Sequence, residues 1–550
     1  MGSQPLAQQP NPNQDRFLSP NPELPTQIPE DSETELSEPI VPIEAPLETD
    51  AQTRILVERI EVIGNTVLDP EALLLITQPL EGQEVTVEEL AQAADAITQL
   101  YLEAGYVTSR AVLPEQEITD GIIQIQIIEG RLGEIQIEGL ERLRSGYVRA
   151  RLQRGVTTPL NANRLEEQLR LLRADPLLEN IRGRLQPSEI PGEPILRVET
   201  QEVDPWRFGL SVDNYSPPSI GSERLGVSLD YQNLSGWGDT LSASYYRSTT
   251  GGSSIWDLGY RLPVNAMDGT ISLRAVFDDN EVTQGAFAGE IDGEVDRYEV
   301  SFRQPLIRTL REELALSTGF TYRDGQTFLG EVPFSFGIGP DKDTGISRTS
   351  VFGFGQDYIR RDSQGAWALR SQFNIGTDLF DATNNEGSVP DSQFFSWLGQ
   401  VQRVQRLSDD NLLIIQGDLQ LTPDSLLPSE QFVIGGGQSL RGYRQNVRAG
   451  DSGFRFSIED RITLTRDEED DEPVIQIAPF IDMGAIWNNA DNPNRLGDQN
   501  FLAGAGLGFL YEPIDGFNIR LDYAVPIVEI DDEGGNAQDQ GFYFNVNYQY

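Results

Sequence analysis

From Trp206 to the end of the chain, apolar and polar residues alternate in short runs, and this pattern restricts the fold more than any other feature. The final run places Phe542, Phe544, Tyr548 and Tyr550 on one face of a strand, with mostly polar residues between them. We count sixteen such runs, and no helical periodicity interrupts them. The runs begin near Trp206, Glu223, Asp239, Ser254, Thr270, Asp296, Leu314, Arg348, Ala366, Phe394, Leu412, Phe454, Ile475, Phe501, Phe517 and Gly541. A spacing of about 22 residues per run and connection suits strands of roughly 10 residues that cross a membrane.

The composition is compatible with a membrane barrel and not with a bundle of membrane helices. Hydrophobic residues make up 38% of the chain, and no stretch reaches the roughly 18 apolar residues of a spanning helix. A soluble β-sandwich or a solenoid is the alternative for so many strands. Aromatic residues at the strand ends, and an aromatic last residue, favour the membrane. We predict an all-β transmembrane barrel of about 16 antiparallel strands over residues 204–550.

The missing residue types and the net charge exclude several classes of function. The chain has no Cys and no His, which removes disulfides, Cys/His zinc sites and Ser-His-Asp catalysis. The acidic run Asp467–Glu472 lacks the ligand spacing of a calcium loop. A formal charge of −46 would repel a nucleic acid. We therefore predict no enzyme activity, no cofactor, no metal site and no nucleic-acid partner.

Residues 1–52 differ from everything that follows. They hold ten of the 33 prolines and ten acidic residues, so they cannot form a packed core. We expect a disordered, acidic, Pro-rich N-terminal segment. The opening Met1–Pro5 shows neither the basic nor the apolar stretch of a signal peptide, so we expect this sequence to be that of the mature chain.

Residues 53–203 contain an internal repeat with an offset of 75 residues. Glu61–Gly64 is matched in kind by a segment that ends at Gly139, and Leu90 is matched by Leu165. The pattern predicts helices over Thr86–Glu103 and Asn163–Arg173, and strands over Ile55–Asn65, Val107–Leu113, Ile122–Ile128, Ile181–Gln186 and Ile195–Thr200. We predict two copies of one small α+β domain, over residues 53–130 and 131–203.

A long connection late in the barrel suggests how the lumen is organised. Residues 422–453 form the sixth outward connection and contain Gly435–Tyr443, with Arg441, Gly442 and Tyr443 at its end. On the thirteenth strand, Asp482 and Gly484 have the parity opposite to an apolar, lipid-facing row, so Asp482 should point into the lumen. We predict that the loop folds inward and that Arg441 docks on Asp482, with Tyr443 packed beside it. Because water should reach this pair, we expect it to contribute about 1 kcal/mol.

These features together resemble one family of outer-membrane proteins. The two small domains, the sixteen strands, the Arg-Gly-Tyr loop at Arg441 and the Phe-x-Asp-x-Gly strand ending at Gly484 resemble POTRA-barrel transporters. Two POTRA-like domains resemble the two-partner-secretion branch, the hemolysin and filamentous-hemagglutinin secretion-activation family. Asp213–Tyr215 and Asn233–Asp239 look like that family's first hairpin. Family members commonly begin with a helix that plugs the pore, and the N-terminal segment does not clearly supply one.

The resemblance implies a function and partners. An unfolded exoprotein with an N-terminal secretion domain would be recognised by POTRA-like domains in the periplasm and passed through the barrel to the cell surface. The barrel would contact outer-membrane lipid and lipopolysaccharide. Its last strand, with Phe542, Phe544, Tyr548 and Tyr550, would be read by the barrel-insertion machinery. The alternatives are a barrel-assembly or protein-import factor of the same superfamily, and a passive porin or an enzyme on the same barrel.

Overall fold

The computed structural model describes residues 54–190, 192–284, 288–468, 471–497, 499–530 and 534–550. The expected disordered segment, residues 1–52, lies outside the described residues. The chain divides between Val203 and Asp204 into two compact units. None of the helices in the described ranges is long and apolar enough to cross a membrane.

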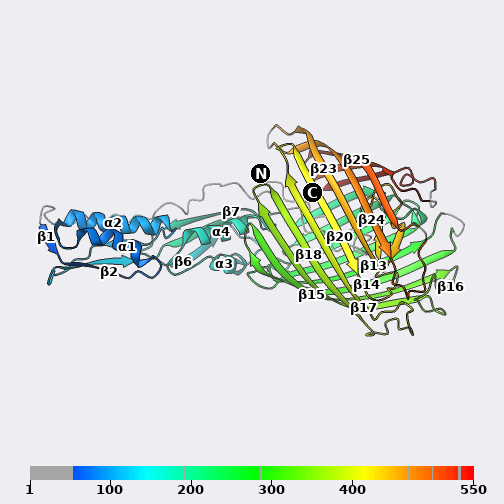
Figure 1. Cartoon of the computed structure of the whole chain (residues 1–550), viewed down its shortest axis with the longest axis horizontal. Coiled ribbons are helices and arrows are strands. Elements are labelled where there is room, and N and C mark those ends of the chain that lie inside the picture. Colours follow the sequence, from blue (N-terminus) through cyan, green and yellow to red (C-terminus); the bar gives the residue numbers. More distant parts are fainter. Residues whose placement is uncertain (1–53, 191, 285–287, 469–470, 498, 531–533) are drawn as a thin grey trace. The chain divides into compact units, whose positions relative to one another are not determined.

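The first unit contains two α+β modules of the same topology, shown in blue to cyan in Figure 1. In the first module a three-stranded sheet has the order β2-β5-β4, and in the second the order is β6-β8-β7. In each sheet one pair is parallel and the other antiparallel. The elements of the first module are β1 (Arg54–Val57), β2 (Arg59–Ile63), α1 (Pro70–Thr77), the 3₁₀ turn η1 (Gln78–Leu80), β3 (Gln83–Thr86), α2 (Val87–Glu103), β4 (Arg110–Val112) and β5 (Ile122–Ile128). Those of the second are β6 (Glu134–Glu138), α3 (Ser145–Gln153), α4 (Ala162–Arg173), β7 (Leu178–Gln186) and β8 (Ile195–Glu202).

The predicted long helices are confirmed, and each covers its own small core. Thr86 begins α2 with a capping box, in which its side chain and that of Glu89 satisfy backbone N–H groups at the helix start. Leu90 on α2 and Leu165 on α4, related by the repeat, are both buried in the cores of their modules. The 75-residue offset also relates the first residues of β2 and β6, of α1 and α3, and of α2 and α4.

One predicted strand is wrong in its extent. The apolar stretch Ile55–Asn65 is not one strand but two, because the backbone breaks at Glu58. The first part, β1, pairs with β3, whereas the second part, β2, pairs with β5. Residue alternation alone does not report a change of pairing partner. The short helices α1 and α3 were also not predicted, since their apolar periodicity is weak.

The second unit is a closed antiparallel barrel, which confirms the predicted fold class. Sixteen long strands follow one another around the barrel, and the last strand pairs with the first (Figure 1). The strands are β9 (Trp206–Asp213), β10 (Arg224–Gln232), β11 (Thr240–Ser248), β12 (Ser253–Pro263), β13 (Thr270–Glu281), β14 (Ile291–Arg308), β15 (Glu312–Leu329), β17 (Ile346–Asp362), β18 (Gly365–Thr377), β19 (Phe395–Arg406), β20 (Asn411–Leu421), β23 (Ser452–Arg466), β24 (Pro473–Trp487), β25 (Phe501–Ile514), β26 (Phe517–Pro526) and β27 (Phe542–Gln549). Four smaller elements lie in the connections. They are the 3₁₀ turn η2 (Pro218–Ile220), the two-residue strand β16 (Val332–Pro333) beside β15, and the strands β21 (Phe432–Ile434) and β22 (Arg448–Gly450), which pair with each other.

The alternation of side chains places the charges inside the barrel. On β24, Ile481 and Trp487 are exposed on the outer wall, whereas Asp482 is buried on the inner wall. The long connection joins the eleventh and twelfth long strands, as the sequence predicts. It covers residues 422–451 rather than 422–453, because β23 begins at Ser452.

Candidate functional site in the barrel lumen

The tip of the 422–451 connection lies against the inner wall of the barrel, where Arg441 meets Asp482 of β24. The Arg441 Nε and Nη2 atoms donate to Asp482 Oδ2 and Oδ1 at 2.7 and 2.9 Å. The backbone N–H of Arg441 also donates to Asp482 Oδ2, at 3.0 Å. Ser457 of β23 adds a fourth hydrogen bond, from its hydroxyl to Asp482 Oδ1 at 2.7 Å. This planar, bidentate arrangement holds both the side chain and the backbone of the loop tip.

Arg441 belongs to a larger cluster of balanced charge on β23 and β26. Its Nη1 atom donates to Glu459 Oε2 at 2.8 Å and lies 3.7 Å from Asp522 Oδ1. Arg520 bridges the same two carboxylates, at 2.6 Å to Glu459 and 2.7 Å to Asp522. Arg461 contacts Glu459 at 2.9 Å. With Asp482, the cluster has three arginines and three carboxylates, so the docked loop leaves no net charge on this part of the wall.

The expectation of a water-exposed pair worth about 1 kcal/mol is wrong. Arg441 is only 6% exposed and Asp482 only 1% exposed. The ring of Phe480 covers the guanidinium, with the central carbon of Arg441 3.2 Å from the ring centroid. In such a dry setting, removing Arg441 leaves the buried charge of Asp482 without a cation, a loss that typically costs about 3–5 kcal/mol.

The residues after Arg441 add further contacts that hold the loop. Gly442 has a φ of +102°, a conformation that favours glycine, and its N–H donates to the Tyr543 hydroxyl at 2.8 Å. The same hydroxyl donates to the Tyr443 carbonyl at 2.7 Å. The Tyr443 hydroxyl lies 2.7 Å from the carbonyl oxygens of Ala503 and Val528, and the ring of Phe480 covers the Arg441 guanidinium.

A second contact fixes the loop at Gln438, shortly before Arg441. Arg455 of β23 pairs with Asp418 of β20, Nε to Oδ2 at 2.7 Å, and its Nη1 atom donates to the Gln438 carbonyl at 2.8 Å. Two glycines of the wall lie where the loop passes closely. A Cβ at Gly504 of β25 would collide with the Arg441 carbonyl of the loop, whereas one at Gly484 would first meet the Phe454 carbonyl of β23 and then crowd the Leu440 side chain. The glycines of this wall therefore serve close packing of the loop.

The last strand closes the barrel, and its predicted residues lie on the outer wall. Phe542 and Tyr550 are exposed, Phe544 and Tyr548 are half-buried, and the intervening Tyr543 is fully buried on the inner wall. β27 pairs with β9 from Asn545↔Asp213 to Gln549↔Gly209. The parity of this strand thus separates an outer aromatic row from the inner tyrosine that holds the loop.

Sequence reasoning did not place Glu459, Phe480, Arg520, Asp522 or Tyr543 in this site, although Phe480 opens the Phe-x-Asp-x-Gly motif. The inner-wall parity of Glu459, Arg520 and Asp522 was visible in the alternation of their strands, but their proximity to Arg441 was not. Within the described ranges, no group of three or more acidic side chains is arranged to hold a metal ion.

A sixteen-stranded barrel that follows POTRA-type modules and holds an inward loop on its wall defines an outer-membrane transporter of the POTRA-barrel class. The family model described as haemolysin secretion/activation protein ShlB/FhaC/HecB matches residues 192–511, and that of the ShlB-type POTRA domain matches residues 55–130. The chain belongs to this haemolysin secretion/activation family. It is therefore a two-partner-secretion transporter of the bacterial outer membrane, and its POTRA region is periplasmic, as throughout the family.

Curated relatives are transporters too. The outer membrane transporter CdiB of Escherichia coli is 25% identical over 410 residues, which cover 72% of this chain and 67% of the relative. The heme/hemopexin transporter protein HuxB of Haemophilus influenzae is 22% identical over 477 residues, which cover 84% and 81%.

Solved structures show the same fold. CdiB from Escherichia coli matches with a TM-score of 0.69 at 22% identity, covering 93% of both chains. CdiB from Acinetobacter baumannii matches with a TM-score of 0.62 at 17% identity, covering 98% of this chain and 95% of the other. BamA from Haemophilus ducreyi lacking POTRA domains 1–3 matches with a TM-score of 0.55 at 16% identity, covering 90% and 100%.

Proposed function

We propose that the modules at residues 53–130 and 131–203 capture an unfolded exoprotein, through its N-terminal secretion domain, in the periplasm. The exoprotein then passes through the barrel of residues 204–550. The docked 422–451 connection, held on the inner wall, keeps the lumen in the arrangement that this passage requires. The observation that carries the proposal is the bidentate contact of Arg441 with Asp482, which ties a long loop to the inner wall. The site acts by binding and positioning, and it needs no catalytic group or cofactor.

Free sheet edges support the capture step. The strands β2 and β4 are the edges of one three-stranded sheet, and β6 and β7 are those of the other. An extended peptide can add to such an edge by main-chain hydrogen bonds. On β2, the N–H of Ile60 donates to the Glu81 carboxylate at 2.9 Å. A backbone carbonyl of an incoming strand could accept this N–H in place of the Glu81 side chain. We infer that the exoprotein replaces such local contacts when it adds to an edge.

The capture step is tested with the purified fragment 53–203, which contains both module cores. We expect it to bind the unfolded N-terminal segment of the partner exoprotein with an affinity of roughly micromolar or weaker, as small transient interfaces do. Calorimetry or NMR titration measures the binding. The absence of detectable binding to the true partner would contradict the capture step.

The positioning role of the loop is tested by a double-mutant cycle. Arg441→Ala and Asp482→Ala should each impair secretion while the barrel stays inserted. The double variant should be little worse than either single variant, because each of the three variants loses the same Arg441–Asp482 side-chain pair. A control is the buried Arg224–Asp213 pair, bidentate at 2.9 and 3.0 Å, which joins β10 to β9. Arg224→Ala should lower the stability of the barrel without releasing the loop. Additive secretion defects in the Arg441/Asp482 double-mutant cycle would overturn the proposal.

The outer wall and the last strand carry the remaining partners of the proposal. The exposed apolar rows of the barrel would contact outer-membrane lipid and lipopolysaccharide. The outward Phe542, Phe544, Tyr548 and Tyr550 would form the signal for the insertion machinery. The match to BamA concerns the fold alone, and the family match favours secretion over barrel assembly or import.

A further inference from the structure

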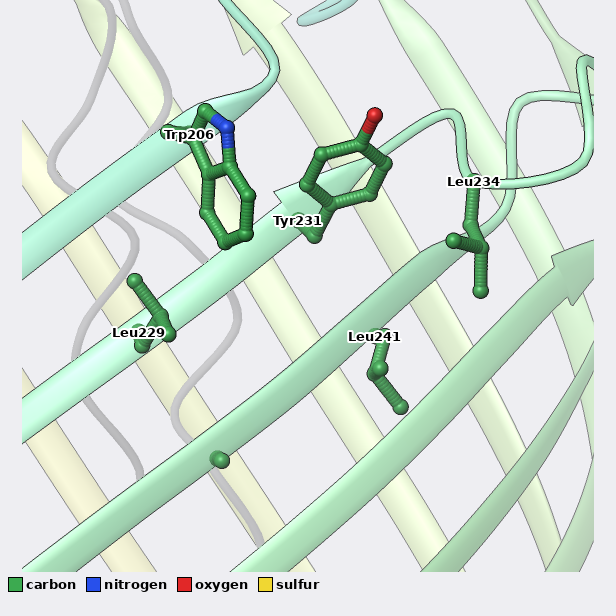
Figure 2. A pocket seen from close by; sticks show the side chains of 6 residues that line it. Trp206, Leu229, Tyr231, Leu234 and Leu241 are labelled. Atoms are coloured by element: carbon green, nitrogen blue, oxygen red, sulfur yellow. The ribbon is translucent and has the colours of Figure 1, made fainter.

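A hollow with apolar walls lies on the barrel surface at the end where the chain enters β9. Its volume is about 460 Å³, within the range of about 300–1,000 Å³ that is typical of ligand pockets. It is lined by Trp206, Leu229, Tyr231, Leu234, Leu241 and Ala243. Figure 2 shows these side chains on three neighbouring strands and the turn that joins two of them.

Strand register explains why the surface is hollow at this place. Tyr231 of β10 lies opposite both Trp206 and Leu241, and these three large side chains form one row across β9, β10 and β11. In the next row Ala243 lies between Leu229 of β10 and Leu258 of β12. The methyl group of Ala243 cannot fill the space between two leucines, so a depression remains below the aromatic row.

The hollow faces away from the lumen. Leu229 and Tyr231 alternate with Ser228, Asp230 and Gln232, whose parity is that of the buried Arg224 on the inner wall. Side chains that line the hollow are largely open: Trp206 is 53% exposed and Leu234 is 54% exposed. In an outer-membrane protein this surface is continuous with the lipid-facing wall, so hydrocarbon is what meets it.

The rim fits the boundary between hydrocarbon and headgroups. The rings of Trp206 and Tyr231 meet edge to face with centroids 4.6 Å apart. Trp and Tyr favour the membrane interface because each joins an apolar ring to a polar group. The POTRA region that precedes β9 is periplasmic, so this rim lies at the periplasmic leaflet, which consists of phospholipid.

We propose that this hollow is a binding site for one acyl chain of a periplasmic-leaflet phospholipid. The chain would lie over Ala243 between Leu229 and Leu241, with the glycerol and headgroup beside Trp206 and Tyr231. A lipid would have a longer residence time at this site, beside the first barrel strand, than elsewhere on the outer wall. The inference depends on the membrane location and not on the path of the exoprotein.

The test uses the full chain in vesicles of phosphatidylethanolamine that include a trace with a photoactivatable group on an acyl chain. Cross-linked peptides are mapped by mass spectrometry. We expect the segment 229–243 to be labelled several-fold more than outward segments elsewhere, such as those around Phe352 of β17 and around Trp367 of β18. Labelling that is uniform around the barrel would overturn the proposal, and this comparison needs no variant.

A pair of matched variants sharpens the result. Ala243→Leu fills the hollow and should reduce labelling of 229–243 several-fold. Ala275→Leu is the control, because Ala275 also lies outward, opposite Leu258 and Tyr298, but does not line the hollow. Equal labelling in wild type and both variants would overturn the site. Labelling of 229–243 that is lost as the protein-to-lipid ratio is raised would assign the hollow to a second copy and also overturn the site.

Discussion

Replacing Gly504 by alanine should release the loop tip without opening the barrel. An added Cβ at Gly504 would lie closer than 3.0 Å to the Arg441 carbonyl oxygen, and this oxygen would have to retreat by roughly 1 Å. The hydrogen bonds of Arg441 to Asp482 measure 2.7, 2.9 and 3.0 Å, so a shift of that size breaks or bends them. Overpacking of this kind costs about 1–3 kcal/mol. The ratio of docked to released loop should therefore fall by about 5- to 150-fold.

Limited digestion with trypsin reports the release, because the docked Arg441 is buried and a released one is accessible. We expect faster cleavage after Arg441 in Gly504→Ala, lower secretion, and an unchanged heat-modifiable barrel on gels. The control is Ala505→Leu, a larger change on the outer face of the same strand, which should behave as wild type. If Gly504→Ala resists trypsin and secretes like wild type, then the close packing between Gly504 and the loop does not hold the loop in its docked position.

Three further outcomes follow from the contacts described. Tyr543→Phe removes a hydroxyl that donates to the Tyr443 carbonyl, so loop docking should weaken by about 1–3 kcal/mol; Tyr548→Phe on the outer wall should change nothing in the same trypsin assay. Deleting Phe542–Tyr550 leaves β9 and β26 each with one unpaired edge, at several kcal/mol for each unpaired backbone group in hydrocarbon, and the protein should vanish from the outer membrane; a normal level of heat-modifiable barrel would contradict this. In the second module, burial raises the pKa of Glu202, but three backbone N–H donors of residues 141–143 and the Arg142 charge outweigh burial and lower the pKa. Its stabilisation should be complete above the ordinary value of 4.5 and lost as the pH falls through the lowered pKa; amide exchange at residues 141–143 should show this dependence in wild type and not in Glu202→Gln.

Much of the architecture was already determined by the sequence. Period-two alternation predicted sixteen strands and the inward parity of Asp482, because successive side chains of a strand must point to opposite faces. The 75-residue repeat predicted two modules, since a shared order of strand and helix is a local property of each copy. A strand boundary such as that at Glu58 was missed because alternation continues across a change of partner.

The charge cluster and the dryness of the site were decided only by the tertiary structure. Glu459, Asp482 and Arg520 come from β23, β24 and β26, and their proximity depends on strand register and on barrel closure. Tyr543 reaches Gly442 across 101 positions of sequence, a contact that no local pattern reports. The sequence placed an arginine in a loop and a carboxylate on a wall. Whether water lies between them depends on how Phe480 and the neighbouring strands close around the pair, and this is a property of the folded barrel.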